Sequence, residues 1–169
     1  MIRVRAMTEG DALRVLGVNA AAGSGVASLD AAELARLLAL PNEHRVAIAG
    51  EDAAFGYALA FPREAAYDGE EFRALRSAIA APFIYIDQVA VAAAHHRRGL
   101  GRALYQALER IAARHRIRIL CCEVNTRPPN PASLAFHARM GFDAFGTLTV
   151  SDGREVRLLT RTLPDPEGA

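Results

Sequence analysis

The chain has 169 residues, of which 51% are hydrophobic and 23% are charged, and its formal net charge is +1. This length and balance are typical of one globular domain with a substantial core, and they argue against a disordered chain. The small net charge gives no electrostatic reason to expect a nucleic acid or an anionic membrane as a partner.

Strand-like and helix-like segments alternate along the chain, which predicts a mixed α/β (α+β) fold in one domain over residues 1–163. The expected elements are, in chain order, a strand over 2–7, helices near 11–21 and 30–40, strands over 44–50, 53–62 and 83–92, a helix near 99–115, a strand over 117–125, a helix near 131–140, and strands over 143–150 and 155–163. Thr8 is the expected N-cap of the first helix, and Asp11 completes a capping box. Gly50-Glu51-Asp52 and Asp152-Gly153 mark two hairpins. The tail over 164–169 is expected to be disordered.

The cysteines and the N-terminus favour a reducing compartment. Cys121 and Cys122 are adjacent within an apolar run, which suits buried free thiols better than a disulfide or a metal site. The N-terminal segment lacks the apolar core of a signal peptide, and no run reaches the length of a membrane span. We therefore expect a cytoplasmic protein that binds no metal, membrane or nucleic acid. The sequence leaves open whether it forms a homodimer.

A basic segment with two glycines lies where the strand over 83–92 gives way to the helix near 99–115. Apolar residues at helical spacing, Leu104, Leu108 and Ile111, fix the core-facing side of this helix. The first N–H groups of the helix and its macrodipole can then bind an anion beyond the end of the strand. The residues expected around that anion are Arg97, Arg98, Gly99, Leu100, Gly101 and Arg102. The alternative is a tight turn with a solvated basic face, which a Gly-x-Gly sequence alone would favour.

A second segment, "EVNTRPPNPASLAFHARMGF" over 123–142, runs from a buried strand through a proline-rich turn into a short helix. Asn130 suits the N-cap, Pro131 the first helical position and Gly141 the position after the helix. Together with "VAVAAAHHRRGLGRAL" it resembles motifs A and B of the GCN5-related N-acetyltransferase (GNAT) superfamily. The nearest resemblance is to an uncharacterised subset that shares an "EVN…PPN…S…FH…GF" string. Two motifs at the correct spacing are more specific than either alone.

The resemblance implies a mostly antiparallel central sheet with flanking helices, whose strands over 83–92 and 117–125 splay apart around the pantetheine arm of acetyl-CoA. It implies direct attack of an amine on the thioester, without a covalent enzyme intermediate. It places acetyl-CoA against the six residues of the basic segment and against Val89, Ala90, Val91, Asn130 and Ser133. By the same resemblance, the amide of Val89 is the expected donor to the oxyanion.

The chain departs from the GNAT motifs at two histidines. His96 stands where motif A usually has Gln or Arg, and little loss is expected because most phosphate contacts in motif A come from the backbone. His137 stands where motif B commonly has the tyrosine that protonates the CoA thiolate. Because Ser133 and His137 share a helix face, we expect His137 to be that acid. The alternative is an amphipathic histidine on the helix surface.

Several residues are candidates for the base and for the amine site. Glu123 interrupts an apolar run, where a carboxylate is costly unless it is paired or functional. Asp87 lies on the same side of its strand as Val89, so either carboxylate could accept a proton through water. His95 is a third candidate, although an exposed loop position suits it better. Asn125 is expected either to hold the proline-rich turn or to contact the substrate.

The connection between 62 and 83 is long enough to be a functional loop, and part of it is expected to be helical. It carries Tyr67 and Phe72, which are expected to cover a cationic amine with an apolar portion. Arginines in the same connection argue for a substrate that also carries a carboxylate: Arg63, Arg73 and Arg76. A small amine, an amino acid and a peptide N-terminus therefore all remain open.

Three other functions compete with acetyl transfer. A catalytically silent CoA-binding or sensory module would keep the fold without the chemistry, and His137 in place of tyrosine keeps this alternative open. A nucleic-acid-binding domain would use the exposed arginines, but the balanced net charge counts against it. A phosphate-binding nucleotide enzyme would need the Gly-Lys-Ser/Thr of a P-loop, which the sequence lacks.

Overall fold

The computed structural model describes residues 1–50 and 54–165. The helices and strands follow in the predicted order, with one helix inside the long connection. They are β1 (Ile2–Ala6), α1 (Ala12–Ala22), α2 (Ala31–Ala39), β2 (Arg45–Ala49), β3 (Ala54–Pro62), α3 (Glu70–Ala78), β4 (Phe83–Val91), α4 (Leu100–Arg114), β5 (Ile119–Arg127), α5 (Pro131–Arg139), β6 (Asp143–Thr149) and β7 (Glu155–Thr162). Short 3₁₀ turns precede α1, follow it and precede α4.

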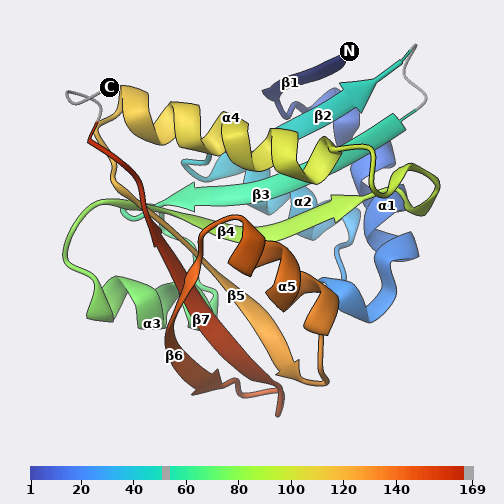
Figure 1. Ribbon diagram of the computed structural model, residues 1–169. Helices are drawn as coiled ribbons and strands as arrows, with labels where there is room; N and C mark the ends of the chain where they lie inside the picture. The colour runs from blue at the N-terminus through green and yellow to red at the C-terminus, as the bar shows by residue number, and fades with distance from the viewer. Residues whose placement is uncertain (51–53, 166–169) are drawn as a thin grey trace.

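The strands form one seven-stranded sheet in the order β1-β2-β3-β4-β5-β7-β6 (Figure 1). Every neighbouring pair is antiparallel except β4 and β5, which are parallel. The predicted mixed, mostly antiparallel sheet is therefore confirmed. The hairpin expected at Gly50-Glu51-Asp52 joins β2 to β3, which do pair, although residues 51–53 lie outside the described part of the chain.

The two central strands separate part-way along their length. β4 and β5 pair only over Phe83–Ile86 and Ile119–Cys122. Beyond that point β4 continues to pair with β3 as far as Val91, while β5 continues to pair with β7 as far as Arg127. The predicted splayed strands are thus present, and the separation leaves one backbone edge of each strand open.

Helices cover both faces of the sheet, each over its own core. Buried side chains of α1, α2 and α3 pack on one face, and those of α4 pack on the other, where α5 adds partly buried ones. Figure 1 shows α4 lying across one face with α1 on the opposite side. Because neighbouring residues of a strand point to opposite faces, Cys121 packs in the first core and Cys122 in the second. Both are free, buried thiols, as predicted.

Local signals in the sequence account for the ends of several helices. Asp11 accepts from the backbone N–H of Thr8 at 2.9 Å, as expected for a capping box. Asn130 caps α5 by accepting from the N–H of Ser133 at 3.2 Å, and Gly141 follows the helix with φ of 81°.

No helix in the described residues is long and apolar enough to cross a membrane. In the tail, Asp165 lies 3.5 Å from Arg118, and residues 166–169 lie outside the described part.

Candidate active site at the opening between β4 and β5

A cavity of about 180 Å³ lies where β4 and β5 separate. It is walled by the loop after α1, by the connection that contains α3, by α5 and by the turn between β6 and β7. The predicted site residues that line it are Tyr67, Asp87, Val89, Glu123, Asn125, Asn130, Ser133 and His137. The fold therefore brings together residues that are up to 70 positions apart in sequence.

The open edge of β4 presents backbone groups to the opening. Ala92 donates its N–H to the carbonyl of Phe55 in β3 at 3.0 Å. Because successive residues of a strand point to opposite sides, the N–H groups of Val89 and Val91 point away from β3, toward the opening. His96 supports this orientation, since its Nε2 donates to the carbonyl oxygen of Val91 at 2.9 Å. Ala90, predicted beside the cofactor, packs its side chain in the core, so only its backbone is available.

The N-terminus of α4 has the features that an anionic group requires. The first α-helical bond runs from the N–H of Ala103 to the carbonyl of Gly99 at 2.9 Å, so the three preceding N–H groups have no acceptor one turn earlier in the helix. Leu100 anchors the helix in the core, and Gly99 has φ of 85°. A Cβ placed on Gly101 would meet only the ring of Phe136, at 3.9 Å, so this side of the helix is open.

The arginines of this segment, Arg97, Arg98 and Arg102, are exposed. Their charge and the N–H groups of α4 together fit the phosphates of CoA.

Two carboxyl groups lie on opposite sides of the opening. Asp87 accepts hydrogen bonds from the hydroxyls of Tyr67 at 2.8 Å and Tyr85 at 3.2 Å, and its burial raises its pKa to about 6. Burial, followed by the nearby Asp87, raises the pKa of Glu123 well above its usual range. Within the described residues, Oε2 of Glu123 is closed off from solvent and has no hydrogen-bond partner. Both groups therefore hold protons more tightly than free carboxylates do, as a base near neutral pH must.

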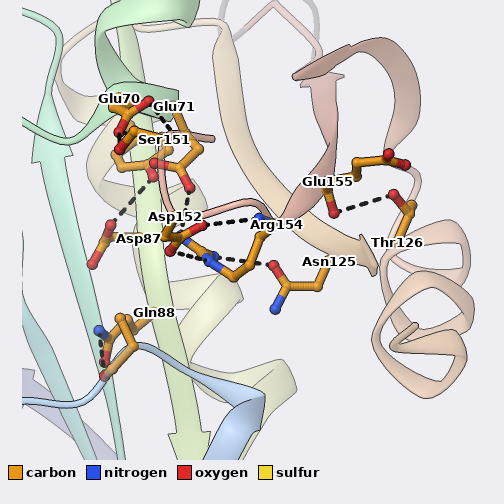
Figure 2. Close-up of polar contacts among 12 residues, drawn as sticks. Glu70, Glu71, Asp87, Gln88, Asn125, Thr126, Ser151, Asp152, Arg154 and Glu155 are labelled. Carbon is orange, nitrogen blue, oxygen red and sulfur yellow. Dashed lines mark hydrogen bonds and ion pairs between the residues drawn. The ribbon is translucent and has the colours of Figure 1, made fainter. Parts of the chain in front are cut away.

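Arg154, in the turn before β7, was not predicted from the sequence, and it connects three elements at the cavity (Figure 2). Its guanidinium donates to Asn125 at 3.1 Å, to Glu71 at 3.3 Å and to Asp152 at 2.7 Å. Asn125 thus holds Arg154 as well as lining the cavity. Within the described ranges, no group of three or more His, Cys, Asp or Glu side chains is arranged to hold a metal ion.

The model of the acetyltransferase (GNAT) family matches residues 20–142. The chain belongs to the GNAT acetyltransferase family. The ribosomal-protein-alanine N-acetyltransferase of Brucella melitensis is similar in structure, with a TM-score of 0.66 and 23% identity over 95% of this chain and 99% of that one. A GCN5-related N-acetyltransferase from Kribbella flavida has a TM-score of 0.68 and 22% identity over 96% and 98%. The structure of yncA from Salmonella typhimurium with its cofactor acetyl-CoA has a TM-score of 0.63 and 18% identity over 98% and 95%. No curated protein matches the sequence.

The environment of His137 does not suit the acid that GNAT motif B led us to expect. Its Nδ1 lies 2.8 Å from the carbonyl oxygen of Ser133, so this nitrogen carries the proton, and its Nε2 then accepts from the hydroxyl of Tyr105. Burial lowers the pKa of His137, which disfavours the imidazolium that an acid role needs. The prediction that His137 shares a face with Ser133 is confirmed, but the structure counts against imidazolium as the acid.

The connection before β4 forms a packed wall of the GNAT site. Phe72, predicted to contact the substrate, is fully buried and packs in the core instead, because the amphipathic α3 turns it toward Phe83. Tyr67 stacks on Phe61 with the ring centroids 4.2 Å apart and points its hydroxyl at Asp87. A Cβ on Gly69 would lie 2.6 Å from the Tyr67 ring, so glycine is required for this placement.

A buried polar cluster fixes the loop after α1, the opposite wall of the cavity. Asn19 donates to the carbonyl of Ala27 at 2.9 Å and accepts from the N–H of Leu29 at 2.8 Å. Gln88, on β4, donates to the same carbonyl at 3.1 Å and accepts from Tyr57 at 2.9 Å. Asn19 and Gln88 were not predicted from the sequence as site residues. The available signal was an amide side chain among apolar neighbours, Asn19 on the helix α1 and Gln88 on the strand β4, since a buried amide needs a partner.

Proposed function

We propose that this GNAT protein transfers an acetyl group from acetyl-CoA to an amine by direct attack. The observation that carries the proposal is the pair of carboxyl groups with raised pKa, Asp87 and Glu123, at the opening between β4 and β5. A carboxylate with a pKa near neutral can accept a proton from an attacking ammonium group and release it again at each turnover. Asp87 lies two residues from the outward-facing N–H of Val89, which can donate to an oxyanion.

The residues that would hold acetyl-CoA extend from this opening to α4. The outward N–H of Val91 suits an amide carbonyl of the pantetheine arm, and those of Leu100–Arg102 suit the pyrophosphate. On the other side of the opening, Asn130 and Ser133 line the cavity. Acetyl-CoA, when bound, supplies the thioester carbonyl that the amine attacks.

The chain's own groups account for the movement of protons. A carboxylate, either Asp87 or Glu123, takes the ammonium proton directly or through water, which frees the nitrogen lone pair to form the C–N bond. The nitrogen of the tetrahedral intermediate then gives up its second proton as the C–S bond breaks. The departing thiolate takes up one proton, so each turnover releases one net proton to solvent. Since a thiol has a reference pKa of about 8.5, the thiolate does not require an acid as strong as imidazolium. His137 in its neutral form instead holds Tyr105 and the start of α5 in place.

Binding and turnover measured together test the proposal. Calorimetric titration with acetyl-CoA should show binding, and a panel of amines should release free CoA thiol with at least one of them. The similarity to a ribosomal-protein-alanine N-acetyltransferase adds a peptide with an N-terminal alanine to that panel. Binding without thiol release across the panel would favour the silent CoA-binding module instead. The two free cysteines support a reducing compartment such as the cytoplasm as the place of action.

A further inference from the structure

We infer that the acceptor is a cationic amine with no carboxylate on the carbon beside its nitrogen, so that free amino acids are poor substrates. The inference rests on the proposed acetyl transfer and narrows its substrate class. A simple amine and a peptide N-terminus both meet this description, because the neighbouring carbonyl of a peptide is an uncharged amide. Three observations on the cavity carry the inference.

The first observation is the balance of charged groups around the cavity. Its walls include three carboxyl groups, those of Glu71, Asp87 and Glu123, against the single guanidinium of Arg154. Oε2 of Glu123 is enclosed and lacks a hydrogen-bond partner in the described part of the chain. An ammonium group supplies positive charge against this excess of carboxyl groups, and N–H donors that their oxygens can accept from.

The second observation is that Arg154 is already engaged with protein groups. Figure 2 shows its guanidinium between Asn125, Asp152 and Glu71, with contacts of 3.1, 2.7 and 3.3 Å. The turn that carries it is also tied to α3, since the N–H of Ser151 donates to Glu70 at 3.1 Å. A substrate carboxylate bound by Arg154 would have to displace these partners or sit beside them, close to like charges.

The third observation is that the arginines of the connection do not line the cavity. Arg63 donates to the backbone carbonyls of Ile79 at 2.9 Å and of Arg76 at 3.0 Å, and Arg76 donates to that of Ala65 at 3.3 Å. Both therefore hold the connection together. Arg73 is exposed and is absent from the residues that line the cavity. These three arginines therefore do not favour a substrate carboxylate, contrary to the expectation from the sequence.

A matched series of acceptors tests the inference on the wild-type protein. For alanine, leucine and phenylalanine, the free acid, the amide and the amine without the carboxyl group are compared by kcat/KM at pH 8. Thiol release gives the rate, and mass spectrometry identifies the acetylated product. In the series with the highest kcat/KM, we expect the kcat/KM of the amide and of the amine to exceed that of the free acid by about tenfold or more, which is about 1.4 kcal/mol. Free acids that match or exceed their amides would overturn the inference and leave acetyl transfer intact.

Charge itself is tested by one variant and by salt. Glu71→Gln removes one carboxylate and should reduce the preference for the amide over the free acid by about threefold or more. Glu109→Gln is the matched control, because Glu109, on α4, pairs with Arg161 of β7 and does not line the cavity. In the wild type, 1 M salt should also reduce the preference, because it shortens the Debye length to about 3 Å. This salt test does not depend on how the variant folds.

If neither Glu71→Gln nor 1 M salt changes the ratio of kcat/KM for the amide to kcat/KM for the free acid, the preference for the amide does not arise from charge. Absence of acetylation with every compound, while acetyl-CoA still binds, would overturn the proposed function and this inference together.

Discussion

Replacing Asp87 by Asn should slow acetyl transfer and at the same time stabilise the folded protein at alkaline pH. Asn keeps the shape of the side chain and an oxygen that can accept from the hydroxyls of Tyr67 and Tyr85. It removes the ionisable group, whose pKa the fold raises from the usual 3.8 to about 6. At 1.36 kcal/mol per pKa unit, the ionised carboxylate costs the folded state about 3 kcal/mol.

The sign follows from proton linkage. Between pH 3.8 and about 6 the folded state binds more protons at Asp87 than the unfolded state does, so its contribution to stability falls as the pH rises. At pH 8 Asp87→Asn should therefore be more stable than the wild type by up to about 3 kcal/mol, roughly 6 to 12 °C in Tm for a chain of this size. At pH 4 the difference should nearly vanish. Turnover with saturating substrates should fall by about 100-fold, as expected on loss of a general base.

Thermal denaturation at pH 4 and pH 8, with thiol release at pH 8, measures both effects. Asp68→Asn is the matched control, because Asp68 is an exposed carboxylate that does not line the cavity. A Tm difference between Asp87→Asn and the wild type that is the same at both pH values would refute the raised pKa. Wild-type turnover in the variant would assign the base to Glu123 or to water.

The remaining predictions concern three walls of the site. Gly101→Val should weaken acetyl-CoA binding by about tenfold or more in calorimetry, because the side chain would occupy the place of the phosphates. The variant should stay folded, since the free protein has room for the side chain, and unchanged affinity would contradict the phosphate site. His137→Phe should lower Tm, because it leaves the buried hydroxyl of Tyr105 unpaired at a cost of about 1–3 kcal/mol. The variant should keep the alkaline limb of the pH–rate profile, and loss of that limb would show that His137 is the acid after all. Asn19→Ala should raise the KM of the amine by about tenfold with kcat little changed, because it removes a hydrogen bond that holds the loop at Ala27. A fall in kcat as large as the rise in KM would show that Asn19 acts in the chemical step.

The order of the elements could be predicted because local patterns determine it. Periodicity, caps and turns are written in neighbouring residues, as in Asn130, Pro131 and Gly141 around α5. The resemblance of the two motifs to those of the GNAT superfamily predicted the arrangement of these elements in the sheet, including the separation of β4 from β5. The ends of the elements moved by one or two residues, as helix and strand ends commonly do.

The parts that could not be predicted depend on contacts between distant segments. Phe72 and Glu71 are neighbours in sequence, yet α3 buries the first in the core and points the second at Arg154, 83 residues away. The partners of His137 likewise come from tertiary structure, since Tyr105 reaches it from another helix. Neither contact leaves a signal in the local sequence, so their effects on pKa and on charge could not be anticipated.

The most direct test of acetyl transfer is the identity of its product. Purified protein is incubated with acetyl-CoA and phenethylamine or phenylalaninamide, and free CoA thiol and acetylated amine are quantified by mass spectrometry in the same sample. We expect one acetylated amine for each thiol released, and a much slower formation of both products with Asp87→Asn. Thiol released without acetylated amine, or neither product from protein that binds acetyl-CoA, would contradict the proposed acetyl transfer.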